Sequence, residues 1–80
     1  MEPKKGLVSQ EIEDGLILYD PEKDESFVLN GTGAFIWQNI SLDQRKIAQL
    51  LSKEFDVGLD QALADVKEFL ALLRERGLLS

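Results

Sequence analysis

Apolar and polar residues follow two different periods along the chain, and the period changes near Asn30. Before this residue, short runs rich in β-branched and aliphatic residues alternate with Gly-, Pro- and Asp-containing turns, a pattern typical of β-strands. We predict strands over Val8–Ile12 and Leu16–Tyr19 around Asp14-Gly15, a pair suited to the positive φ angles of a tight hairpin turn. The polar turn "DPEKDE" precedes a third strand, Ser26–Leu29, so that the three strands form an antiparallel meander.

After Asn30, apolar residues recur at helical spacing. Asn30 or Thr32 can cap a first helix, and Ser41, followed by Gln44, has the capping-box pattern that opens a second helix of about 43–55. A third helix should begin at Asp60 and end near residue 76, with residue 77, a glycine, in the left-handed conformation and Leu78 and Leu79 folding back onto the core. Three strands followed by three helices predict an α+β fold, a winged helix-turn-helix with the sheet placed first.

The third helix is apolar over roughly half of its circumference, which is wider than the stripe of about 100° that a surface helix commonly buries. One border of the apolar arc carries Lys67 and Arg74, and the other carries Asp65 and Arg76. Either border would form an apolar groove with a charged rim. The alternative is that the apolar residues are all core, as we also expect for Trp37. The arc consists of Leu63, Val66, Phe69, Leu70, Leu72 and Leu73.

The strand Ser26–Leu29 has no Lys, Pro or bulge signal within it. Strand edges are usually protected by such features against uncontrolled pairing. An unprotected apolar edge beside an apolar helix groove is the arrangement by which an extended peptide is bound as an added strand. The alternative is an ordinary strand that is covered by the N-terminal segment or by a second copy of the chain.

Composition excludes several classes of function. The 80 residues include no Cys and no His, which removes thiolate chemistry, the usual zinc ligands and the commonest general base. The net charge of −6 repels phosphate backbones and anionic lipid. The acidic residues of "EIED" and "PEKDE" lie in predicted turns, where solvated charge is usual. We expect one domain over residues 1–80, flexible over 1–7, without catalytic activity, metal or cofactor, in the cytoplasm, with no nucleic acid and no membrane as partner.

The stretch "YDPEKDESFVLNGTGAFIW", followed by "IAQLLSKEFDVGLDQALADVKEFLALLRERGLL", resembles the pyrroloquinoline quinone biosynthesis protein D (PqqD-like) family. Members of this family have a strand that ends in Leu-Asn, a Thr-Gly-Ala helix start and an Ile-Trp pair. The resemblance extends from about Gly15 to Leu79. The corresponding residues are Leu29, Asn30, Thr32, Gly33, Ala34, Ile36 and Trp37.

The resemblance implies a RiPP recognition element, a non-catalytic peptide chaperone. Such modules bind the leader of a ribosomally made precursor peptide and present it to a maturation enzyme, which is a radical S-adenosylmethionine enzyme in some pathways and a leader peptidase and cyclase in lasso-peptide pathways. The leader would add as a strand to the third strand and lie against the third helix. Main-chain pairing would come from Ser26, Phe27, Val28 and Leu29. Pocket residues would be Val66, Phe69, Leu70 and Leu73, and rim residues would be Asp65, Lys67 and Arg74.

Two other functions stay open at this point. A winged-helix fold can bind DNA, although the third helix, from residue 60 to 76, has only three basic residues against four acidic ones. A structural homodimer would hide the strand edge against its own copy, whereas leader binding predicts a monomer with an accessible edge.

Overall fold

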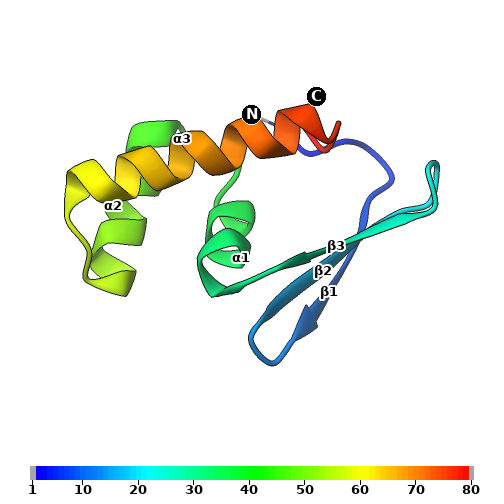
Figure 1. Cartoon of the computed structure of the whole chain (residues 1–80), viewed down its shortest axis with the longest axis horizontal. Helices are drawn as coiled ribbons and strands as arrows, with labels where there is room; N and C mark the ends of the chain where they lie inside the picture. Colours follow the sequence, from blue (N-terminus) through cyan, green and yellow to red (C-terminus); the bar gives the residue numbers. More distant parts are fainter. Residues whose placement is uncertain (1, 80) are drawn as a thin grey trace.

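The computed structural model describes residues 2–79 of the chain and contains three strands followed by three helices. The strands form one sheet at one end of the molecule, and the longest helix runs across the top of the other two (Figure 1). The order and type of all six elements agree with the sequence prediction of an α+β, winged-helix-like fold. They are β1 (Val8–Ile12), β2 (Gly15–Asp20), β3 (Glu25–Leu29), α1 (Gly31–Gln38), α2 (Gln44–Phe55) and α3 (Leu59–Glu75).

The sheet is antiparallel with the strand order β1-β2-β3. A two-residue turn joins β1 to β2 and pairs Ile12 with Gly15. The positive φ angles expected at Asp14-Gly15 are absent, so that part of the prediction was wrong. Gly15 is required for a different reason: a Cβ atom at this position would lie 1.9 Å from the main-chain oxygen of Leu29. Glycine therefore allows β2 to approach the end of β3.

Short polar side chains cap the N-termini of the first two helices. The Asn30 side chain accepts a hydrogen bond of 2.9 Å from the Gly33 N–H at the start of α1. At the start of α2 the cap is Asp43, which accepts a bond of 2.8 Å from the Lys46 N–H, and Ser41, the expected cap, lies outside the helix. The third helix starts one residue before Asp60, and no side chain caps it.

The core lies between the inner face of the sheet and the three helices. The sheet contributes alternate residues of β2, whose burial pattern switches between buried and half-buried along the strand. As expected, Leu78 folds back onto the core after the left-handed Gly77, which has a φ of 73°. The buried apolar residues are Leu16, Leu18, Leu29, Ala34, Ile36, Ile40, Ile47, Ala48, Leu51, Ala62, Val66, Leu70, Leu73 and Leu78.

An ion pair connects the N-terminal segment to the sheet. The Asp20 carboxylate is buried and accepts a hydrogen bond of 2.8 Å from Lys4. This bond lowers the pKa of Asp20 and raises the pKa of Lys4. The backbone of the same segment pairs with the end of the chain, through Pro3 opposite Leu79 and a bond from the Lys4 N–H to Leu78. The expected flexibility of residues 1–7 stays a prediction, and residue 1 lies outside the described residues.

Candidate functional site

One edge of the sheet is formed by β3, which pairs only with β2 in the part of the chain that the structure describes. Successive residues of an antiparallel strand direct their N–H and C=O groups alternately toward one neighbour and then the other. Because Gly15 pairs with Ile12 across the two-residue turn, the main-chain groups of Leu16 and Leu18 point toward β3. These two residues pair with Leu29 and Phe27, whose main-chain groups therefore point toward β2. The main-chain groups of Ser26 and Val28 therefore point toward the open edge.

A groove runs between β3 and α3. It consists of two adjoining hollows of about 370 and 290 Å³, which share Val28 and Leu29 of β3 and Phe69 and Leu72 of α3. The first hollow extends to the start of α1, and the second extends to Leu78 near the end of the chain. We refer to the two together as the β3–α3 groove.

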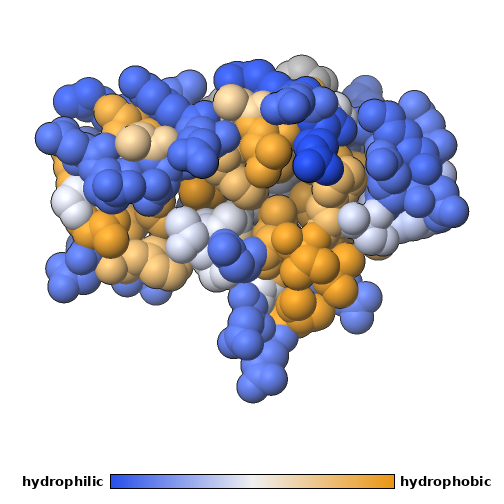
Figure 2. Space-filling model, viewed as in Figure 1, coloured by the Kyte–Doolittle hydropathy of each residue, from blue (hydrophilic) through white to orange (hydrophobic). Residues whose placement is uncertain are grey.

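The β3–α3 groove presents apolar side chains to solvent. Leu72 is 44% exposed, whereas Phe69 is half-buried and packs against the core. Val28 is 71% exposed, but its side chain alternates along β3 with the core-facing Phe27 and Leu29 and so lies on the outer face of the sheet. The Phe69 ring lies directly over α1, because a Cβ atom on Gly33 would be only 3.1 Å from it. In the space-filling view, apolar surface extends from the sheet up toward α3, with polar surface on both sides (Figure 2).

The charges at the rim of the groove differ between its two ends. Asp65 and Glu68 line the hollow beside the start of α1, whereas Arg76 lines the hollow near the C-terminal end. The Asp65 carboxylate accepts a hydrogen bond of 2.8 Å from Gln61 on the same helix. A ligand in the groove would therefore meet negative charge at one end and positive charge at the other.

The structure brings together seven of the eleven residues that the sequence predicted for the site. The strand residues 26–29 line the β3–α3 groove, and so do Asp65, Phe69 and Leu73. The structure does not bring the other four helix residues to it. Val66 and Leu70 are completely buried in the core, because the helix turns them inward. Lys67 and Arg74 are exposed and do not line the groove.

Residues that the expected site omitted also line the groove. Glu68 and Leu72 share with Phe69 the stripe of α3 that faces β3, and Arg76 follows directly after the helix. The start of α1 closes one end of the groove, through Asn30, Thr32 and Gly33. Leu72 and Arg76 belong to one of the two borders of the apolar arc, so the sequence contained a signal for them but did not show which border was correct.

A search of the described residues for a metal centre finds none. They include no group of three or more acidic side chains arranged to hold a metal ion. The one buried carboxylate among them, that of Asp20, is neutralised by Lys4. None of the helices in residues 2–79 has the length and apolar character needed to cross a membrane.

Two solved structures are similar to this chain over nearly its whole length. One is TbiB1 in complex with the TbiA(beta) leader peptide, with 24% identity and a TM-score of 0.90 over 100% of this chain and 95% of that one. The other is lasso peptide synthetase B1 complexed with the leader peptide, with 25% identity and a TM-score of 0.87 over 96% and 93% of the two chains.

Sequence comparisons give the family. No curated protein matches the chain. Residues 15–79 match the model of the family described as Coenzyme PQQ synthesis protein D (PqqD). This range includes β2, β3 and all three helices, and with them both walls of the β3–α3 groove. The chain belongs to the PqqD family.

Proposed function

We propose that this protein binds the leader segment of a ribosomally made precursor peptide and presents it to a maturation enzyme. The observation that carries this proposal is the juxtaposition of an open strand edge with an apolar groove, both formed by β3. The two structural neighbours were solved with leader peptides, which supports the same function.

The geometry favours binding by strand addition. An extended peptide beside β3 would bond to the outward main-chain groups of Ser26 and Val28, and these bonds would provide affinity for almost any sequence. Alternate side chains of the peptide would point toward α3 and contact Phe69 and Leu72, which would provide selectivity. The start of α1 closes one end of the groove and so would help to set the register.

Presentation needs no bond-making by this chain. Binding in the micromolar range, about −8 kcal/mol, would keep a leader near an enzyme that the protein also contacts and raise its effective concentration there. Because the affinity is moderate, the modified peptide could still leave. We propose that the protein is a non-catalytic, cytoplasmic monomer, without a cofactor.

The partner enzyme would be the leader peptidase of a lasso-peptide pathway, with its cyclase, in preference to a radical S-adenosylmethionine enzyme. The support is the similarity to lasso peptide synthetase B1. The DNA-binding function is not favoured, since two of the three charged side chains at the groove rim are acidic and the net charge is −6.

The proposal can be tested with two synthetic peptides, the leader half and the core half of the precursor encoded beside this chain. Titration calorimetry should show micromolar or tighter binding of the leader half alone. Amide resonances of Ser26, Val28 and the α3 stripe should shift together in the labelled protein. Equal binding of both halves, or shifts confined to the acidic turn 20–25, would contradict the proposal.

A further inference from the structure

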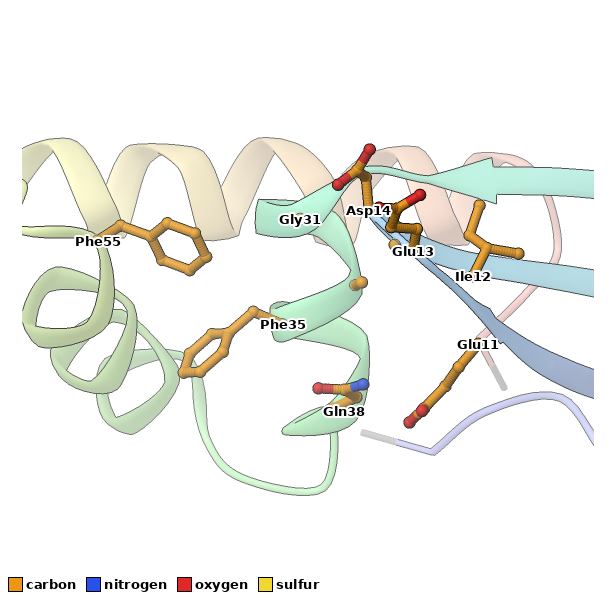
Figure 3. Close-up of a pocket in the computed structure, with 10 residues that line it drawn as sticks. Glu11, Ile12, Glu13, Asp14, Gly31, Phe35, Gln38 and Phe55 are labelled. Carbon is orange, nitrogen blue, oxygen red and sulfur yellow. The ribbon is translucent and has the colours of Figure 1, made fainter.

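A second cleft lies on the other side of α1. It has a volume of about 530 Å³, larger than either hollow of the β3–α3 groove, and it is lined by the tip of the β1–β2 hairpin, one face of α1 and the end of α2. Figure 3 shows α1 in the middle, with the hairpin on one side and two phenylalanines on the other. We call it the hairpin cleft.

An aromatic pair forms one side of the hairpin cleft. Phe35 and Phe55 make an edge-to-face pair, with ring centroids 5.6 Å apart and an angle of 84° between the rings. Phe55 is 40% exposed despite this contact, whereas the side chain of Ile12 extends away from α1 (Figure 3). Large apolar side chains left in contact with water around one concave surface are typical of a site that a partner covers.

The charged residues of the hairpin cleft are all acidic. Glu11, Glu13 and Asp14 line it, and no Lys or Arg does. In Figure 3 the side chains of Glu13 and Asp14 extend from the hairpin tip, and that of Glu11 extends toward the α1 residue Gln38. The Lys4 ion pairs involve carboxylates elsewhere, on Asp20 and Glu22. The rim therefore attracts a cation and repels acidic surfaces.

Helix α1 forms a wall of both binding surfaces, through different faces. Ala34 and Phe35 face the hairpin cleft, whereas Gly33 and Ile36 face the β3–α3 groove. The two surfaces share no lining residue. A peptide in the groove would therefore leave the hairpin cleft open to a second partner.

We propose that the hairpin cleft is the docking surface for the maturation enzyme, through a segment of that enzyme that places an aromatic or aliphatic side chain against Phe35 and Phe55 and a Lys or Arg beside the hairpin carboxylates. The charge of the rim selects this occupant. A second copy of this chain, with its own net charge of −6, would be repelled, and so would nucleic acid. The identity of the partner rests on the proposed function, but the existence of a basic partner does not.

The test uses calorimetry of the full chain with the purified leader peptidase of the proposed pathway, with and without bound leader. The double variant Glu11→Lys/Glu13→Lys reverses two rim charges and leaves the Asp14-Gly15 pair of the turn intact. The matched control is Glu22→Lys/Glu25→Lys, which makes the same change in net charge at the opposite end of the sheet. Glu22 is 3.6 Å from Lys4 and highly exposed, so that contact contributes little to stability.

We expect the rim variant to bind the enzyme at least about fivefold more weakly than the control variant does. The uncharged variant Phe55→Ala should also weaken binding, whereas Leu59→Ala, at a similarly exposed residue that does not line the hairpin cleft, should not. Binding of the enzyme to the wild type should weaken as salt is added and should persist when the leader is bound.

Several outcomes would overturn the proposal: equal effects of the rim and control variants, no binding of the enzyme to the wild type, or self-association of the wild type that the rim variant abolishes. Leader affinity, measured for every variant, separates this proposal from the proposed function. If the leader binds neither the wild type nor any variant, the proposed function fails. The comparison of the rim and control variants would still decide whether the hairpin cleft docks the enzyme.

Discussion

Leu72→Ala tests directly whether the β3–α3 groove binds the leader. Leu72 is 44% exposed in the groove, and complete burial of a leucine side chain contributes roughly 2 kcal/mol. Docking can bury only the exposed part, so truncation should cost about 1 kcal/mol of binding free energy. This loss corresponds to a roughly fivefold increase in Kd.

Leu59→Ala is the matched control, because Leu59 lies on the same helix, is 42% exposed and does not line the groove. Both variants remove the same atoms from partly exposed leucines, so we expect similar, small losses of thermal stability. Calorimetry with the leader peptide should show the increase in Kd for Leu72→Ala alone. Thermal melts followed by circular dichroism would check that both variants are folded.

Two results would refute the reasoning. An unchanged Kd in a folded Leu72→Ala variant would mean that the peptide does not cover this side chain. An equal increase in Kd for Leu59→Ala would mean that the effect comes from general destabilisation of α3 and not from contact in the groove.

Three further predictions follow from the geometry. Val28→Pro removes a main-chain donor that points to the open edge, so it should abolish most leader binding in a folded protein. Val28→Thr keeps the donor and should bind the leader as the wild type does in the same titration. The reverse result would contradict strand addition. Gly33→Ala places a methyl group 3.1 Å from the Phe69 ring in the groove and should weaken leader binding a few-fold. The control Gly31→Ala meets no atom within 4 Å, so it should bind the leader as the wild type does and, by calorimetric melting, match or exceed its stability. Equal leader affinities of the two variants would rule out a role for the ring. Because the pKa of Asp20 is lowered in the folded state, its ion pair stabilises the protein fully above the unfolded pKa of about 4 and loses this effect as the pH falls through the folded value. Asp20→Asn should therefore melt at a lower temperature than the wild type at pH 7, and the difference in melting temperature should narrow in acid. A difference that stays constant with pH would show that the charge on Lys4 is not involved.

The sequence predicted the fold well because the signals for the six elements are local. The change from strand to helix at Asn30 is visible in the sequence, and Asn30 is the cap that the structure shows. The errors are also local choices between adjacent candidates. Asp43 caps α2 in place of Ser41, since its carboxylate reaches the Lys46 N–H. At the β1–β2 turn, Gly15 is required by the approach of Leu29 and not by a positive φ.

The binding surfaces were harder to predict because they depend on how distant elements pack. Periodicity showed that α3 is apolar on too wide an arc, but not which border faces the sheet. The packing of the helices and sheet around α3 buries Val66 and Leu70 and leaves Leu72 exposed. The hairpin cleft was not predicted at all. Its walls come from three separated segments, and the acidic residues of "EIED" are typical of a solvated turn when they are read alone.

The open edge of β3 also bears on how leader sequences can diverge. A strand added to this edge would turn every second side chain toward α3 and the others away from it. Backbone bonds at Ser26 and Val28 would form whatever those outward residues are. Selection on the leader would then act with a period of two, so that related precursors should keep apolar residues at alternate positions and vary freely between them.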